Sequence, residues 1–134
     1  MSKLNRPCSY VLAFLFLEIS IASAHHAVQA QFDVQELRTF TGVMTKVELI
    51  NPHPYLHMDV QQDDGLVENW AIESVALNAL RQAGLLKELQ VGREYTVEAH
   101  PARSGEAIAL MVAITLPNGN RLVMRSLDPA LARQ

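Results

Sequence analysis

Histidines are the residues of this chain whose spacing first suggests chemistry. His25 and His26 are adjacent, and His53 and His57 stand four residues apart. If the chain is cleaved after Ala24, His25 becomes the amino terminus, where the terminal amine and the imidazole of the same residue can chelate one metal ion. A second imidazole, from His26 or His53, would complete a site suited to Cu(II), and zinc and nickel are alternatives that imidazole ligands also bind.

The same histidines also have an ordinary structural interpretation. A His-His pair near a chain end need bind nothing, and His53, within Asn-Pro-His-Pro, can simply fix a turn by bonding the backbone. His57 can be a solvent-facing strand residue. The candidate metal ligands are His25, His26, His53 and His57, and the carboxylates that could orient them are Asp33, Asp59 and Glu73.

Other kinds of reactive site have little support in the sequence. The single cysteine, Cys8, precedes the apolar run of the leader, so the processed chain would hold no thiol for zinc, iron–sulfur or haem attachment. The chain has no HExxH motif, phosphate-binding loop or dinucleotide fingerprint, and only three serines follow residue 24. We therefore expect a binding or accessory protein and not an enzyme.

The first 24 residues predict a secretory signal peptide. Two basic residues precede an apolar run over residues 11–17, and Ala22-Ser23-Ala24 supplies the small residues of a cleavage site. A spanning helix needs about 20 apolar residues, more than this segment has. Cleavage after Ala30 is an alternative that would remove both adjacent histidines. The expected location is periplasmic or secreted, without stable membrane insertion after cleavage.

Removal of this leader makes the chain more acidic. The full sequence has 11 Lys and Arg and 14 Asp and Glu, which gives a net charge of −3. Lys3, Arg6 and Glu18 leave with the leader, so 9 basic and 13 acidic residues remain, a net charge of −4. Nucleic-acid-binding proteins usually present basic patches. The expected partner is therefore a metal ion or another exported protein, and no nucleic acid is expected.

The first half of the mature chain predicts three strands. Residues 39–50 are rich in β-branched and apolar residues, and a change of phase near Thr45-Lys46 predicts a β-bulge. Asn51-Pro52-His53-Pro54 ends this strand, because proline cannot donate a ladder hydrogen bond. Residues 55–60 alternate cleanly, and Asp63-Asp64-Gly65 predicts a three-residue hairpin turn into residues 66–73.

Pairing across that turn fixes the register of the hairpin. It places Met58 opposite Trp70 and Leu56 opposite Ile72 on the inner face. His57 and several other polar residues then share the outer face, which could hold a small polar ligand, a glycan or a protein partner, or could simply be solvated. The candidate ligand-binding residues on this face are Tyr55, Asp59, Asn69 and Glu73.

A helix is expected between the third and fourth strands. Residues 74–83 switch to helical spacing, with Ser74 as a candidate N-cap and Gly84 as a stop. Further strands are predicted over residues 93–100, 107–116 and 121–125. This order is typical of a mainly β, OB-like antiparallel barrel of five to six strands, and an open sheet with one helix is the alternative. The expected parts are a signal peptide (1–24), an irregular lead-in (25–38), the barrel (39–125) and a tail (126–134).

The chain also carries an ordered series of short motifs. They are His25-His26, Phe32-Asp33, Thr41-Gly42, Asn51-Pro52-His53, Trp70-Ala71-Ile72-Glu73 and Ala113-Ile114-Thr115-Leu116-Pro117-Asn118-Gly119. Together they cover nearly all of residues 25–125 and resemble a family of small exported bacterial proteins classed as a domain of unknown function. Leu49 stands where that family usually has an aromatic residue, and Ala113 where its last motif has valine. The resemblance implies export and this fold, and it supplies no activity.

Overall fold

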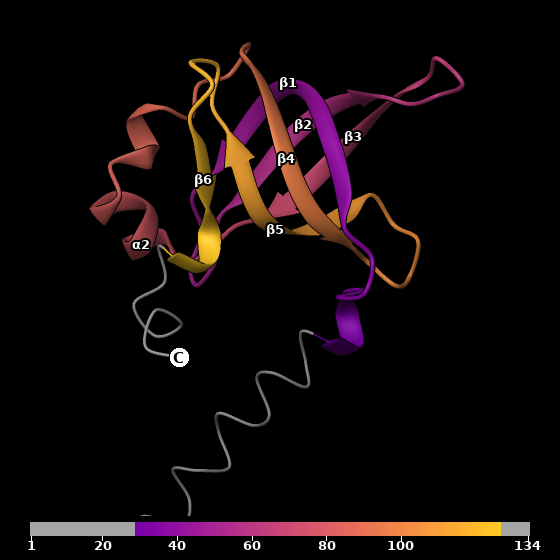
Figure 1. Cartoon of the computed structure of the whole chain (residues 1–134), viewed down its shortest axis with the longest axis horizontal. Helices are drawn as coiled ribbons and strands as arrows, with labels where there is room; N and C mark the ends of the chain where they lie inside the picture. The colour runs from indigo at the N-terminus through magenta and orange to yellow at the C-terminus, as the bar shows by residue number, and fades with distance from the viewer. Residues whose placement is uncertain (1–28, 127–134) are drawn as a thin grey trace, which may run out of the picture. The chain divides into compact units, whose positions relative to one another are not determined.

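The computed structural model describes residues 29–126 (Figure 1). The predicted signal peptide, His25, His26 and nearly all of the predicted tail lie outside the described residues. Residues 29–31 are helical, and the compact domain begins at Phe32. No helix within residues 29–126 is long and apolar enough to cross a membrane.

Six strands form a single sheet in the described part of the chain. They are β1 (Arg38–Glu48), β2 (Tyr55–Gln61), β3 (Val67–Glu73), β4 (Glu94–Pro101), β5 (Ile108–Thr115) and β6 (Arg121–Val123). Their order is β3-β2-β1-β4-β5-β6, and an additional β3–β5 pairing closes the first five into a barrel with β6 at its edge (Figure 1). The OB-like barrel prediction is confirmed, with one difference. The closing β3–β5 pair is parallel, so the barrel is mixed and not wholly antiparallel.

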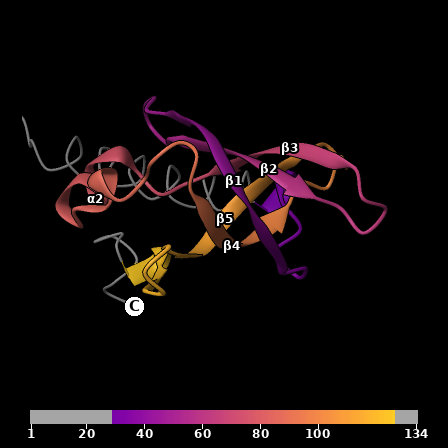
Figure 2. The same ribbon diagram turned by 90° about the horizontal axis from the view of Figure 1, so that it is seen from above.

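The long first strand is shared between two neighbours. Its first half pairs with β4 and its second half with β2, and in the view from above it runs diagonally across the barrel (Figure 2). The register with β2 shifts between Met44 and Lys46, which confirms the predicted bulge. The extra residue, Thr45, lets Met44 point into the core while the strand continues around the barrel.

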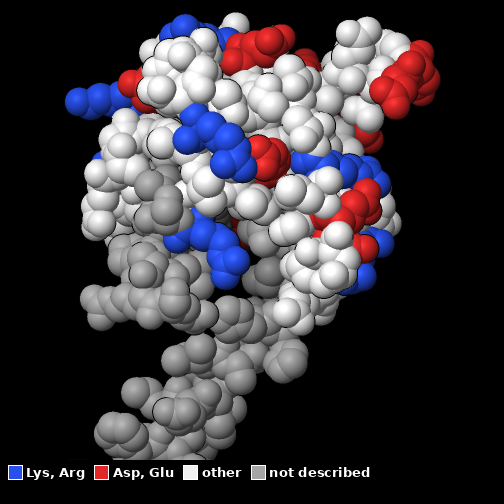
Figure 3. Space-filling view, viewed as in Figure 1, with Lys and Arg blue, Asp and Glu red and all other residues white. Residues whose placement is uncertain are grey.

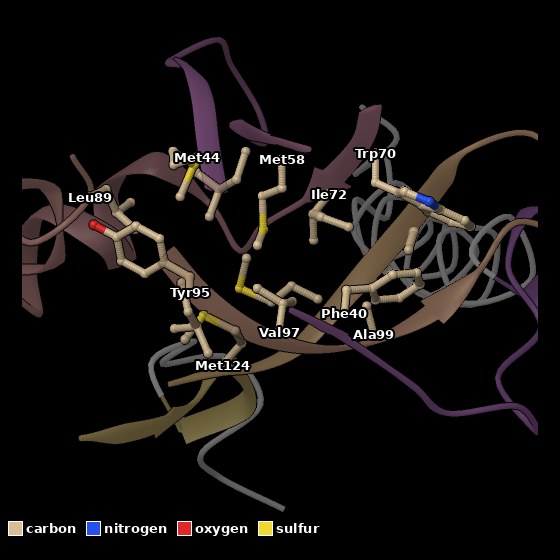
Figure 4. Close-up of a cluster of buried hydrophobic side chains, with 14 of the residues drawn as sticks. Phe40, Met44, Met58, Trp70, Ile72, Leu89, Tyr95, Val97, Ala99 and Met124 are labelled. Carbon is tan, nitrogen blue, oxygen red and sulfur yellow. The ribbon is translucent and has the colours of Figure 1, made fainter. Parts of the chain in front are cut away.

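The β2–β3 hairpin has the predicted register. Met58 pairs with Trp70 and Leu56 with Ile72, and all four side chains are buried. Gly65 takes a positive φ of 83° in the turn, which a residue with a side chain adopts only under strain. In Figure 4 the side chains of Met44, Met58, Ile72 and Trp70 face those of Tyr95, Val97 and Ala99 of β4, so the core lies inside the barrel.

The helix begins later than the sequence predicted. α2 spans Leu77–Gln82, its N-cap is Ala76, and no side chain caps it. Ser74 was the expected cap, but its N–H donates to the carbonyl of Pro54 at 2.9 Å, which holds it against the β1–β2 loop. Its buried hydroxyl makes no hydrogen bond to the described residues. The predicted stop is confirmed, since Gly84 has a φ of 71° before the 3-10 turn η1 (Leu85–Lys87).

The last two predicted strands also differ in detail. Residues 107–116 are apolar on both faces, and the sequence shows one phase from Ile108 onward. In β5, however, Ala109 and Met111 are the buried residues at the start, and the register against β4 shifts after them, so Ile114 is buried again farther along. The predicted strand over 121–125 ends at Val123, and the chain continues as the 3-10 turn η2 (Met124–Ser126).

Candidate functional site

A row of polar side chains crosses three strands on the outside of the barrel. Tyr55 of β2 pairs with Glu48 of β1 on one side and with Glu73 of β3 on the other. Directly opposed residues have Cβ atoms about 4.5–5.5 Å apart, so the phenol stands between two carboxylates. We define the outer polar face as Glu48, Tyr55, His57, Asp59, Asn69 and Glu73, together with His53 from the β1–β2 loop.

Glu73 holds two neighbours at once. Its Oε1 lies 2.6 Å from Nδ1 of His53, and its Oε2 accepts a hydrogen bond of 3.1 Å from the hydroxyl of Tyr55. The carboxylate is 14% exposed and the His53 side chain 42% exposed. In the neutral tautomer that donates Nδ1–H to Glu73, the second nitrogen of His53, Nε2, carries the lone pair.

Glu48 forms the corresponding cluster on β1. Its Oε1 lies 2.9 Å from Nζ of Lys46, and its Oε2 lies 2.9 Å from Nε2 of His57. The hydrogen bond from Lys46, and then that from His57, lowers the pKa of Glu48 below its ordinary value. Glu48 is therefore an ionised carboxylate over the whole physiological pH range.

The position of Tyr55 between these clusters changes the pKa of its phenol. Burial raises the pKa of its phenol above 10, and the charges of Glu73 and Glu48 raise it further, because both disfavour a phenolate. The hydroxyl thus keeps its proton and acts as a fixed donor to Glu73. This arrangement gives the outer polar face a neutral aromatic ring flanked by two carboxylates.

A third set of contacts organises the other end of the face. The side-chain amide of Asn69 donates to Oδ1 of Asp59 at 2.7 Å and to Oγ1 of Thr45 at 3.0 Å. Thr45, the bulge residue, donates in turn to the backbone carbonyl of His57 at 3.2 Å. The bulge therefore joins β1 to the polar groups of the hairpin, and Asn69 has little freedom to rotate.

The structure brings together all the hairpin residues that the sequence proposed as ligand-binding, and it adds Glu48, which the sequence interpretation missed. The signal for Glu48 was its position in the strand that pairs with β2 across the bulge. The carboxylate of Asp33, the third group predicted to orient the histidines, pairs with Arg103 at 3.2 Å.

The predicted histidine set is not assembled in the described part of the chain. His53 and His57 are held by different glutamates, and within residues 29–126 no group of three or more His, Cys, Asp or Glu side chains could hold a metal ion. His25 and His26 lie outside the described residues. His100, the fifth histidine, lies with Nδ1 2.7 Å from the backbone carbonyl of Glu36.

Charged residues elsewhere on the barrel also act in local pairs. Figure 3 shows Lys and Arg interspersed with Asp and Glu on one face of the molecule. Arg121 of β6, for example, makes two hydrogen bonds to Glu98 of β4, at 2.7 and 2.8 Å. These bonds lower the pKa of Glu98 and raise that of Arg121. The pair ties the edge strand to the barrel.

A closed barrel with a helix between its third and fourth strands defines an OB-type fold. The chain belongs to a family of unknown function, DUF6152, whose family model matches residues 15–111. This confirms the resemblance to an uncharacterised family. The comparison with curated proteins found no match.

Solved structures with a similar fold include two crystal structures of the mitochondrial single-stranded DNA-binding protein Rim1 from S. cerevisiae. The first is 18% identical with a TM-score of 0.48, and the match covers 61% of this chain and 93% of that one. The second is 16% identical with a TM-score of 0.45, and covers 66% and 94%. Likeness at this identity concerns the fold alone.

This finding corrects the partner prediction. The net charge of −4 predicts a metal ion or an exported protein as the partner and no nucleic acid. The comparison contradicts this prediction, because solved structures similar in fold are those of single-stranded DNA-binding proteins; the likeness itself concerns only the fold. Net charge averages over the whole chain, whereas recognition depends on the local surface of a fold.

Proposed function

We propose that this protein is exported and binds a small polar ligand on its outer polar face. The expectation of export rests on the charge, apolar run and small residues of the first 24 positions. The binding role rests on one observation: Tyr55 is fixed between Glu48 and Glu73, and each of those carboxylates is itself held by neighbouring side chains. Groups held in this way lose little conformational freedom when a ligand arrives.

The chemistry of this face favours a ligand rich in hydroxyl groups. Glu48, Asp59 and Glu73 are acceptors, and the Tyr55 ring offers a flat, partly apolar surface beside them. A sugar presents several hydroxyl donors around an apolar ring face, so it matches both features. In OB-type barrels generally, the second and third strands form the surface that takes oligosaccharides and oligonucleotides. We therefore propose an oligosaccharide as the ligand class.

Binding of chitotetraose and cellotetraose can be followed in amide NMR spectra of the mature protein. We expect one of these probes to shift signals of residues 55–59 and 69–73 saturably. Asn69→Ala should weaken that binding about tenfold, because it removes two hydrogen bonds that fix the face. Thr41→Ala is the matched control, since Thr41 bonds Thr96 elsewhere on the outside of the barrel. Shifts spread over the whole barrel, or an Asn69→Ala variant that binds normally, would contradict the proposal.

A divalent metal ion is the second candidate ligand, and the geometry of His53 is the observation that favours it. A metal-binding histidine commonly donates one ring N–H to a carboxylate, which leaves the lone pair of the other nitrogen for the ion. Glu73 holds Nδ1 of His53 in this way, and the His53 side chain is 42% exposed. Copper, zinc and nickel are the ions that an imidazole without thiolate ligands suits.

Calorimetric titration of processed protein with Cu(II) and Zn(II) tests this second candidate. We expect binding tighter than about 10 μM that His53→Ala weakens at least about tenfold, because a ligand is lost. His100→Ala is the control, because that imidazole binds a backbone carbonyl instead. Deletion of His25 tests the predicted amino-terminal chelate in a separate arm. Equal affinity in the His53→Ala variant, or no binding at this level, would count against the metal.

A further inference from the structure

A separate hollow lies beside the turn of the β2–β3 hairpin, where Gln62 and Glu68 line it. Its volume is about 380 Å³, near the lower end of the range for small-molecule sites. Its lining comes from the start of β1 at Arg38, the end of the β2–β3 hairpin around Glu68, and the β4–β5 loop. No residue of the outer polar face contributes to it, so a ligand here would occupy a second site.

Trp70, together with Pro101 and Ala102, supplies the apolar part of this lining. Its ring packs against Phe40 with centroids 4.5 Å apart (Figure 4), and its Nε1–H donates to Oε2 of Glu68 at 3.0 Å. Only 5% of Trp70 is exposed, so the indole is held firmly by the core beneath it. Because the indole is fixed, its hydrogen bond also fixes the carboxylate of Glu68 at the wall of the hollow.

The two arginines in the lining are already neutralised by neighbouring carboxylates. Arg38 pairs with Glu36 at 2.5 Å, and Arg103 pairs with Asp33 at 3.2 Å. These four side chains therefore add no net charge to the hollow. Any net electrostatic preference must come from the remaining charged residues.

Glu68 and Glu106 are those remaining residues. Glu68 accepts its hydrogen bond from the indole, and Glu106 accepts one of 2.9 Å from the hydroxyl of Ser104. These donors are neutral and do not cancel a charge, so the lining, with two arginines and four acids, carries a net charge of −2. A concave, partly apolar wall concentrates the field of such charges.

The geometry of these carboxylates does not suit a bare metal ion. In the described part of the chain they are too dispersed to form a group of three ligands around one ion. An organic cation differs in this respect, because its charged groups are separated by a carbon chain. One charged group can then meet each carboxylate while the chain lies against the indole.

We propose that this hollow binds a small aliphatic amine or guanidinium compound, with its cationic groups at Glu68 and Glu106 and its carbon chain against Trp70. The site is independent of the outer polar face and of whatever ligand that face takes.

Trp70 is the only tryptophan of the chain, so its fluorescence reports directly on this hollow. Three probes of the same length separate charge from shape: cadaverine, which has two ammonium groups, neutral pentane-1,5-diol, and the dianion glutarate. We expect a saturable change in fluorescence with cadaverine alone, and weaker binding as ionic strength rises. An equal response to the diol, a preference for glutarate, or no saturable response to cadaverine would overturn the proposal.

Isosteric variants locate the binding. Glu68→Gln retains an acceptor for the indole N–H and removes only the charge, and Glu106→Gln does the same beside Ser104. Each should weaken cadaverine binding at least about fivefold, and the double variant should abolish it. Glu73→Gln makes the same change on the outer polar face and should leave cadaverine binding unaltered. Parent-like binding by the double variant, or loss of binding in Glu73→Gln, would place the cation elsewhere and refute the site.

Discussion

A Gly42→Ala variant should lose about 3 kcal/mol of folding free energy, at the upper end of the usual cost of overpacking. A Cβ atom at this position would lie 2.3 Å from the backbone carbonyl oxygen of Asp59 and 3.0 Å from the side chain of Val60. A side chain could rotate away, but the carbonyl belongs to the β1–β2 ladder, so the two strands themselves must separate. For a domain of this size the loss corresponds to a fall in Tm of roughly 12 °C or more.

Gly65→Ala provides the matched control for that substitution. Nothing lies within 4 Å of a Cβ atom at Gly65, but the residue has a φ of 83°. The cost there is conformational, about 1 kcal/mol. Thermal unfolding of both variants should therefore rank Gly42→Ala well below Gly65→Ala. Equal losses would mean that β1 can move away from β2 at little cost, and that Gly42 is not needed for their close approach.

The sequence predicted the hairpin register well because only one pairing buries all of its large apolar residues. A one-residue shift of β3 against β2 would turn Trp70 and Ile72 to the outside together. The bulge at Thr45 was equally predictable, since the alternation of apolar residues along the strand shifts by one residue there. β5 carried no comparable signal. With apolar residues on both faces, its periodicity could not show which side chains point inward or where the register shifts.

The candidate site was only partly predictable for a related reason. Alternation places Tyr55 and Glu73 on one face, because they lie in the same hairpin. Glu48 reaches that face only through the β1–β2 pairing, whose register depends on the bulge. The partners of His53 and His57 were likewise hidden, because a contact such as His53 with Glu73 joins residues 20 positions apart. Spacing along the chain identified the histidines but could not show that each would be held by its own glutamate.

The sequence prediction was least accurate at the start of the domain. The sequence predicted an irregular lead-in up to residue 38, but Phe32 is 1% exposed and forms an isolated bridge with Ala102 at the end of β4. The following residue, Asp33, donates its N–H to the carbonyl of Pro101 at 2.8 Å. A single phenylalanine forms no repeating apolar pattern, so its burial could not be predicted from the sequence. Both predicted cleavage sites leave Phe32 in the mature chain.

Phe32→Ala should therefore destabilise the domain by about 3–5 kcal/mol, the cost of removing a buried phenylalanine. Leu37→Ala, in the same segment, removes an apolar side chain that is 54% exposed, and its effect should stay within about 0.5 kcal/mol. Urea unfolding of the two variants measures the difference. If both changes cost the same small amount, this segment does not contribute to the folded domain. A large loss only in Phe32→Ala establishes that the domain begins before β1, with the Phe32 side chain as part of its buried interior.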